Sequence, residues 1–192
     1  MDSAPRHLSE IDLQQGLTEV EAAPPDAGRL DAIFVRPGVG ERRTLTTATL
    51  TAEGGIDGDR WATDGRHDDG RPDPRNQVSL MNARLLRLIA DQSEAMCLAG
   101  DNLIIDFDLS DENLPTGSRL AIGQVVLEIT DLAHTGCTKF SKRYGQQARQ
   151  FVNSPRGKEL HLRGRYARIV TGGTISVGDS VLKCAAASTS SC

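Results

Sequence analysis

The chain has 192 residues, which is enough for one domain of ordinary size and short for two. With 38% hydrophobic but only 4% aromatic residues, its core must be built mainly from valine, isoleucine and leucine. The net charge of -4 argues against strong binding to nucleic acid or to an anionic membrane surface.

The N-terminal stretch lacks a basic start followed by an apolar core, so the sequence predicts no signal peptide. No apolar run approaches the roughly 20 residues that a membrane-spanning helix needs. The four cysteines lie far apart without a CxxC pair, which argues against a zinc ribbon. Together these features predict a reduced, cytoplasmic protein with no membrane partner.

Residues 1–29 form the first segment, a polar leader or linker that contains Pro24, Pro25 and Gly28. Apolar residues within it recur at a spacing that predicts one short helix. The main domain is expected over 30–183. The small polar residues of 184–192 predict a disordered tail.

Strand signals dominate the domain. Runs of β-branched and apolar residues bounded by glycine and proline predict strands over 32–36, 45–52 and 103–109. Residues 54–75, between the second and third of these, are crowded with glycine, aspartate and arginine. They predict a long loop of the kind that is usually functional or mobile.

Two helices are predicted inside the domain. Asn82 is placed to cap the first, which runs to about Cys97 with leucine and isoleucine on its apolar face. The second follows Cys137, because Tyr144, Ala148 and the apolar residues after them recur at helical spacing.

One pattern occurs twice. Residues 117–128 and 172–183 place a glycine between two short apolar runs in the same way, so both predict a hairpin with a glycine turn. A hairpin used twice is typical of a closed or nearly closed barrel, in which unpaired edge strands are avoided. The alternative is a chance recurrence of a common hairpin pattern. The predicted fold class is mixed α/β, mainly β, with a few peripheral helices.

Cys137 is the first candidate for chemistry. It lies between a predicted strand and a predicted helix, where backbone N–H groups and the positive charge of Lys139, Lys142 and Arg143 favour the thiolate. A thiolate attacks sulfur or binds a metal. The alternative is a small buried hydrophobe without reactivity. His134 is close enough in sequence to form a Cys-His pair, but spacing alone does not establish one.

Basic residues form a block from Lys139 to Arg168, against Glu159 alone. Such a block is suited to an anion such as a phosphate, although a solvated basic face is the commoner reason for one. Arg60, Arg75 and Gln77 lie in or beside the long loop and offer a second possible anion site.

Several segments resemble the MOSC domain family. In chain order they are Gly54–Arg60, Arg75–Leu80, Ala99–Leu103, Leu120–Gly123, the stretch around Cys137, Gly164–Arg168 and Gly172–Asp179. The resemblance covers roughly residues 30 to 183, and the order of the motifs is more specific than any one of them. Asp101 stands where the family usually has glutamate.

The resemblance implies a barrel-like, mainly β domain that holds a molybdenum cofactor, with Cys137 as its functional cysteine. In the family this position either ligates molybdenum in reductases of N-hydroxylated compounds or relays sulfur as a persulfide. Cofactor-binding roles are then implied for a group of polar residues around Cys137 and in the matching motifs. They are Arg60, Arg75, Gln77, Asn102, Thr135, Lys139 and Arg168.

Three hypotheses follow from the resemblance. The first is a reductase that receives electrons from a separate electron-transfer protein. The second is a sulfur carrier, supplied by a separate cysteine desulfurase because this chain has no pyridoxal-phosphate domain. The third is a binding module that has kept the fold without the chemistry. Neither the substrate nor the oligomeric state follows from the sequence.

Overall fold

Short β-branched runs and glycine turns produce a strand-rich fold in the computed structural model, which describes residues 7–64, 70–90 and 92–185. The strands are β1 (Ala27–Val35), β2 (Arg43–Leu45), β3 (Thr47–Thr51), β4 (Gly55–Ile56), β5 (Val78–Asn82), β6 (Leu103–Asp106), β7 (Arg119–Ile122), β8 (Val125–Ile129), β9 (Arg165–Thr171), β10 (Gly173–Ser176) and β11 (Ser180–Lys183). The helices are α1 (Glu10–Glu21), α2 (Ala83–Ile89), α3 (Thr138–Tyr144), α4 (Gln146–Asn153) and α5 (Pro155–Glu159). Three 3-10 helices are η1 (Arg60–Thr63), η2 (Pro74–Asn76) and η3 (Ser93–Ala99).

Seven of the described strands close into a barrel, in the order β1, β6, β5, β9, β8, β7 and β11. The last barrel strand returns to the first, with Ala27 of β1 opposite Leu182 of β11. Strand β2 extends the sheet beyond β1, and β3, β4 and β10 form a smaller three-stranded sheet. The prediction of a mainly β barrel is confirmed.

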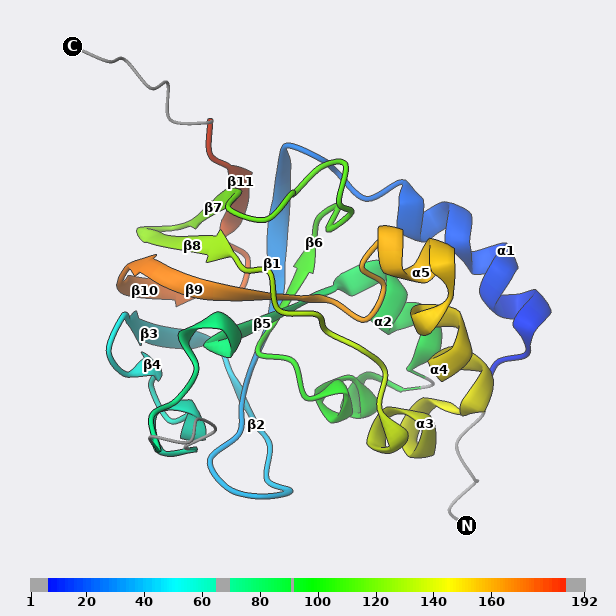
Figure 1. Cartoon of the computed structure of the whole chain (residues 1–192), viewed down its shortest axis with the longest axis horizontal. Coiled ribbons are helices and arrows are strands. Elements are labelled where there is room, and N and C mark those ends of the chain that lie inside the picture. The colour runs from blue at the N-terminus through cyan, green and yellow to red at the C-terminus, as the bar shows by residue number, and fades with distance from the viewer. Residues whose placement is uncertain (1–6, 65–69, 91, 186–192) are drawn as a thin grey trace.

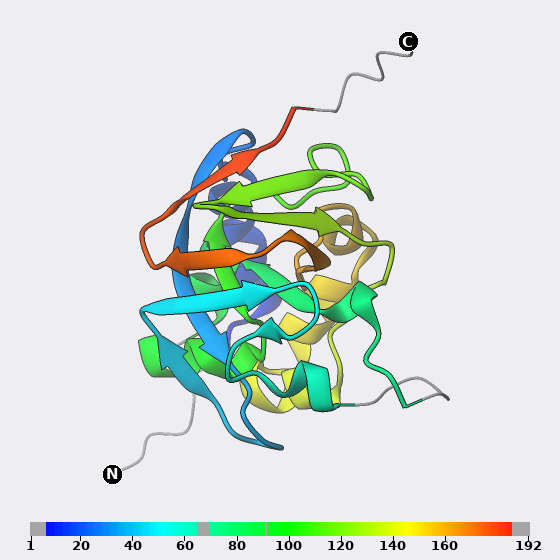
Figure 2. The ribbon, with the colours of Figure 1, turned by 90° about the vertical axis from the view of Figure 1, so that its left-hand side faces the viewer.

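The helices gather against one side of the barrel, while the opposite side consists of strands (Figures 1 and 2). One apolar cluster fills the barrel, and a second lies between the barrel wall and the helices. Gly28 shows how closely the strands approach, since a Cβ at this position would lie 1.9 Å from the Asp106 carbonyl oxygen. No helix among the described residues is long and apolar enough to cross a membrane.

The N-terminal segment contains the predicted short helix as α1. Ser9 caps it, and Leu13 and Val20 are buried in the second cluster. The segment predicted as a leader or linker therefore carries a helix that packs on the domain. The boundary at residue 30 stays a prediction, with β1 running across it. Of the predicted tail, only residues 184 and 185 belong to the described part of the chain.

The first predicted helix is too long. Asn82 caps α2 as expected, because its side chain accepts hydrogen bonds from the N–H groups of Arg84 and Leu85. The helix then ends at Ile89, since Ala90 is in an extended conformation (ψ 114°). Of the remaining predicted helix, residues 93–97 belong instead to the separate 3-10 helix η3.

Only one of the two predicted hairpins forms. Strands β7 and β8 pair with each other through the turn at Gly123. Strands β10 and β11 do not pair, because β10 joins β3 in the smaller sheet and β11 joins β7 and β1 in the barrel. The repeated pattern therefore predicts the strands correctly but not the second pairing.

The segment predicted as one long loop is partly ordered into β4, η1 and η2. Trp61 of η1 joins the first part of this segment to its C-terminal end. Its indole N–H donates to the Asp73 carbonyl and to Asn76 Oδ1, both at 3.1 Å. Residues 65–69 lie outside the described part.

Candidate functional site

Cys137 is an exposed residue at the N-terminal end of α3, where it serves as the N-cap. The residue before it, Gly136, is fixed to α4: its N–H donates to Asn153 Oδ1 at 2.8 Å. Its carbonyl accepts from Asn153 Nδ2 at 2.9 Å and from Arg149 Nε at 3.2 Å. The backbone that carries the thiol is therefore held in place while the residue itself remains accessible.

The surroundings of Cys137 favour its ionised form. Partial burial opposes ionisation, but the backbone N–H groups of Phe140 and Lys139, together with the charge of Arg163, lower the pKa of the thiol below its ordinary value. The side chain can therefore act as a nucleophile or a soft ligand without a neighbouring base.

This lowered pKa gives a testable pH dependence. We expect the rate of Cys137 alkylation by iodoacetamide to reach half its maximum at a lower pH in the folded protein than in the same chain unfolded in urea. Arg163→Leu should move that midpoint upwards, because it removes a charge that stabilises the thiolate. The measurement is peptide mapping by mass spectrometry over a pH series. An unshifted midpoint in the wild-type chain would contradict the assignment.

Arg163 and Asp101 form a buried ion pair beside Cys137. Arg163 Nη1 lies 2.7 Å from Asp101 Oδ2, and Nη2 donates to the Ala99 carbonyl at 3.0 Å. The guanidinium carbon lies 5.1 Å from the ring centre of Phe140, which is in the first turn of α3. Burial raises the pKa of Asp101, and the charge of Arg163 opposes that rise.

His134 packs on the other side of this ion pair. Its ring stacks on Tyr166 with the centroids 4.2 Å apart, and its Nδ1 atom lies 3.6 Å from Asp101 Oδ1. Burial, together with the positive charges of Arg163 and Arg36, lowers the pKa of His134 well below its ordinary value. The imidazole is therefore neutral at physiological pH.

Asn102 joins four segments of the chain beneath the site. Its Oδ1 atom accepts from the Ser79 N–H, the Ser79 hydroxyl and Arg36 Nη2 at 3.0–3.1 Å. Its Nδ2 atom donates to the Phe34 carbonyl at 3.2 Å and to Asp59 Oδ2 at 3.0 Å. Arg36 also pairs with Asp59 at 2.9 Å.

Two arginines converge near the site without a carboxylate partner among the described residues. Arg42 Nη2 lies 3.3 Å, and Arg143 Nη1 4.0 Å, from the point that a Cβ on Gly100 would occupy. Burial, together with the nearby charges of Arg143, Arg36 and Arg60, lowers the pKa of Arg42. Like charges held this close favour an anion between or beside them.

Buried side-chain atoms without a hydrogen-bond partner are concentrated around this site. In the described part of the chain they are Arg42 Nε, Arg60 Nε, Asp101 Oδ1, His134 Nδ1 and Arg163 Nε. These groups interact electrostatically with one another or with Arg36. Because buried polar atoms are normally paired, their concentration here indicates a place prepared for a polar ligand.

The structure brings some of the predicted cofactor-binding residues to the cluster formed by Cys137, Arg163, Asp101 and His134, called here the Cys137 cluster. Asn102 lies within it, although both ends of its amide bind other parts of the protein. Arg60 lies at its edge, paired with Asp64 at 3.2 Å. Thr135 and Lys139 are exposed on either side of Cys137. Their roles in binding a cofactor stay predictions.

Other predicted residues hold strands and loops together elsewhere. Gln77 is buried, with Nε2 donating to the Ala52 carbonyl at 2.7 Å and Oε1 accepting from the Ile169 N–H at 2.8 Å. Arg75 pairs with Asp73 at 2.8 Å.

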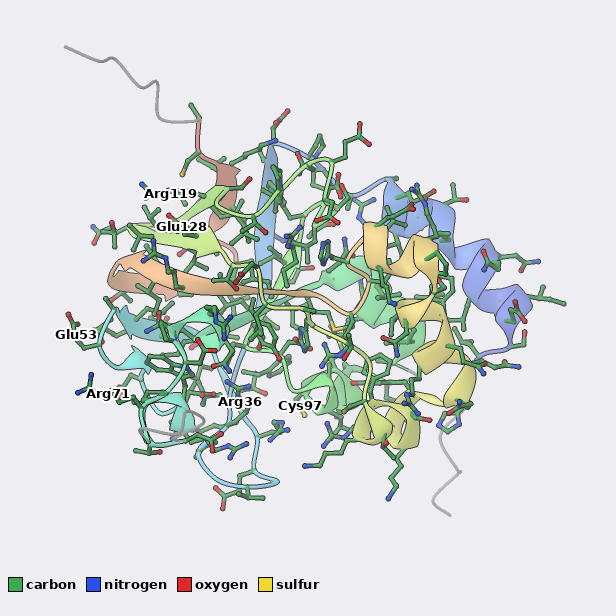
Figure 3. The ribbon with its side chains drawn as sticks, in the orientation of Figure 1. Arg36, Glu53, Arg71, Cys97, Arg119 and Glu128 are labelled. Atoms are coloured by element: carbon green, nitrogen blue, oxygen red, sulfur yellow. The ribbon has the colours of Figure 1, made fainter. Side chains whose placement is uncertain are left out.

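Arg168 lies on β9 and pairs with Glu128 at 2.6 Å. Glu128 also pairs with Arg119, at a barrel edge well separated from Arg36 (Figure 3). The structure therefore does not bring Arg168 to the Cys137 cluster.

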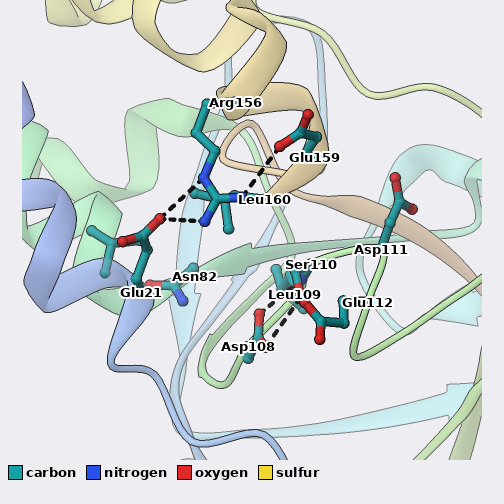
Figure 4. Close-up of a pocket in the computed structure, with 11 residues that line it drawn as sticks. Glu21, Asn82, Asp108, Leu109, Ser110, Asp111, Glu112, Arg156, Glu159 and Leu160 are labelled. Carbon is teal, nitrogen blue, oxygen red and sulfur yellow. Dashed lines mark hydrogen bonds and ion pairs between the residues drawn. The ribbon is translucent and has the colours of Figure 1, made fainter.

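A cavity of about 370 Å³ lies apart from this cluster, between α1, α5 and the 108–112 segment (Figure 4). Its lining is rich in carboxylates, and Arg156 already pairs there with Glu21 at 2.6 Å and Glu159 at 3.2 Å. An acidic lining is unsuited to an anionic cofactor, so this cavity does not compete with the Cys137 site for one.

The fold agrees with the comparisons. The family model of the MOSC domain matches residues 67–182, more than half of the chain, so this chain belongs to the MOSC family. A comparison with curated protein sequences gave no significant match.

Solved structures with the same fold include the YuaD protein from Bacillus subtilis, with a TM-score of 0.55 and 15% identity over 81% of this chain and 94% of that one. YiiM from Geobacillus stearothermophilus gives a TM-score of 0.52 and 12% identity over 82% of this chain and 75% of that one. YiiM from Escherichia coli gives a TM-score of 0.53 and 16% identity over 82% of this chain and 70% of that one. At such identities the likeness shows the fold alone.

Proposed function

We propose that this MOSC protein binds a molybdenum cofactor through Cys137 and reduces N-hydroxylated compounds with electrons from a separate electron-transfer protein. The observation that carries the proposal is the presence of three unpartnered buried arginine N–H groups, Arg42 Nε, Arg60 Nε and Arg163 Nε, beside an accessible, readily ionised thiol. Such atoms are costly unless something binds to them.

The residues present fit the cofactor. A thiolate is a soft ligand suited to a metal that also binds sulfur from the pterin. Arg42 and Arg143, which have no carboxylate partner among the described residues, would supply the positive charge that the cofactor's phosphate requires. Among the described residues, no three His, Cys, Asp or Glu side chains gather as a metal cage. The metal would therefore arrive with ligands of its own, and Cys137 would add one.

Each residue has a role that follows from its contacts. The Gly136 anchor to α4 orients the Cys137 thiol, and the Arg163–Asp101 pair places a positive charge near it. The bound cofactor would supply two-electron redox chemistry. Reduction of an N–O bond to N–H also consumes two protons and releases water, so the site must admit proton donors as well as electrons.

A second candidate function is sulfur transfer. The observation that favours it is the exposure of Cys137, which leaves the thiolate open to a separate cysteine desulfurase. A thiolate with a lowered pKa accepts a sulfane sulfur to form a persulfide.

The proposal is tested by elemental analysis for molybdenum and by pterin fluorescence. The protein would be purified from cells that make the cofactor, with the wild-type chain beside Cys137→Ser, Cys97→Ser and Cys184→Ser. We expect near-stoichiometric metal in the wild type and both control variants, and its loss in Cys137→Ser, because this substitution removes the thiolate that would ligate the metal.

Absence of molybdenum from the wild type would overturn the first candidate. Intact-mass detection of a persulfide on Cys137 would then support sulfur transfer. Neither species, in cells that supply both cofactor and desulfurase, would leave a binding module without chemistry.

A further inference from the structure

His134 is a buried side chain whose hydrogen bonds are incomplete. Only 9% of it is exposed, and it has no hydrogen bond within the described residues. Of its two ring nitrogens, Nδ1 alone is completely shielded from solvent without a partner. The Nε2 edge of the ring therefore provides the remaining contact with the surroundings.

The atom that faces Nδ1 decides which nitrogen carries the proton. Asp101 Oδ1 lies 3.6 Å away, is fully buried and also lacks a partner, so a contraction of a few tenths of an ångström completes one hydrogen bond for both atoms. Burial raises the pKa of Asp101, but its ion pair with Arg163 at 2.7 Å opposes that rise and holds the side chain as a carboxylate, which only accepts hydrogen bonds. The neutral imidazole must then carry its proton on Nδ1.

Two contacts set the orientation of the ring. Tyr166 covers one face at 4.2 Å with an interplanar angle of 26°, which fixes the plane of the imidazole, and Asp101 Oδ1 favours the orientation that places Nδ1 on its side. Gly164 passes close to the Nδ1 edge, where a Cβ would lie 3.4 Å from that atom. The titratable and charged groups that act on His134 are Asp101, Arg163, Arg36 and His161.

A continuous set of contacts connects His134 to Cys137. Asp101 joins His134 to Arg163, and Arg163 lies over Phe140. The N–H of Phe140 faces the Cys137 sulfur, and the charge of Arg163 also reaches that thiol. His134 and Cys137 thus lie on two sides of one ion pair.

We infer that His134 is a ligand-binding residue of the Cys137 site: Asp101 holds the imidazole proton on Nδ1, and the free lone pair of Nε2 accepts a hydrogen bond from an N–H or O–H group of the ligand. This deepens the proposed function, on which the identity of the ligand rests. An N-hydroxylated compound carries such an O–H group, and its O-alkylated derivative does not. His134 therefore selects for the free hydroxyl.

The tautomer is measured on the full chain by long-range ¹H–¹⁵N correlation spectra of ¹⁵N-histidine protein at pH 7.5, with His134 assigned from its loss in His134→Gln. We expect a protonated Nδ1 and a bare Nε2 in the wild type. Asp101→Glu should keep that tautomer because it keeps the carboxylate, whereas Asp101→Asn should lose the preference. A proton on Nε2, or on both nitrogens, in the wild type would overturn the inference without reference to any variant.

Selection for a hydroxyl is measured with acetone oxime and its O-methyl ether. The oxime has one hydrogen-bond donor, its O–H group, and the ether has none. The readout is the titration of the His134 Nε2 resonance and the affinity of each compound. We expect the oxime to shift that resonance and to bind roughly tenfold more tightly, as one hydrogen bond allows. His134→Phe should remove the difference, and His134→Gln should restore part of it. Equal affinities, or no binding of either compound, would overturn the inference.

Molybdenum content, measured on the same samples, keeps the two proposals separate. Suppose that Nε2 is unprotonated and the oxime is preferred, but the protein contains no molybdenum. This result would support His134 as a binding residue and refute the cofactor. Molybdenum without oxime preference would sustain the cofactor and refute the role of His134.

Discussion

Replacing Arg163 with leucine is expected to lower the free energy of unfolding by roughly 3–5 kcal/mol, the usual effect of removing one partner of a buried ion pair. The substitution leaves the Asp101 carboxylate, whose side chain is 0% exposed, without its 2.7 Å partner. It also removes the hydrogen bond to the Ala99 carbonyl and the contact with Phe140. Urea unfolding followed by circular dichroism measures the loss.

Two controls distinguish the effect of leaving a buried charge unpaired from the effect of losing any arginine. Arg168→Leu removes a partly exposed partner of Glu128, and a surface pair of this kind contributes less than about 1 kcal/mol. The double variant Arg163→Leu/Asp101→Leu should be less destabilised than Arg163→Leu alone, because it leaves no isolated charge. Equal effects of Arg163→Leu and Arg168→Leu would show that the pair is not buried as described.

Asn102→Ala is expected to be similarly damaging, at about 3–5 kcal/mol. The side chain makes five hydrogen bonds to four residues of three other segments, and its removal leaves several of those buried groups unpaired at about 1–3 kcal/mol each, partly recovered by relaxation. Chemical denaturation with the same readout tests it.

The matched control is Asn153→Ala, which removes a partly exposed asparagine with two hydrogen bonds to Gly136. Its expected cost is about 1 kcal/mol, and it should act on the position of Cys137 more than on global stability. If Asn102→Ala cost no more than Asn153→Ala, the hydrogen bonds around Asn102 would not support the fold as proposed.

Much of the fold follows from local pattern. The Asn82 cap, the break between strand and helix at Cys137 and the glycine turn at Gly123 are set by residues close in sequence, and all three were predictable. The strands with which β10 and β11 pair were not predictable. The pattern of β10 and β11 matches that of β7 and β8, but the partner of each strand depends on the barrel and on the smaller sheet, which a local pattern does not encode.

The candidate site was predictable only in part. Cys137 stands out because its chemistry and its flanking charge are local. Asp101 and Arg163 meet across 62 positions, and the sequence gives no sign that they form an ion pair. Gln77 shows the opposite case: its residue type is suited to a ligand, but both ends of its amide hold the backbone of the barrel and the nearby loop.

The pairing of β1 with β11 has a consequence for how the chain folds. These strands are more than 140 positions apart in the sequence, so barrel closure depends on a contact that forms late and carries a large loop-closure entropy. During synthesis, a nascent chain that has reached β10 still has the edges of β1 and β7 unpaired and open to intermolecular association. The last strand thus completes the sheet and ends the period in which the protein is most prone to aggregate.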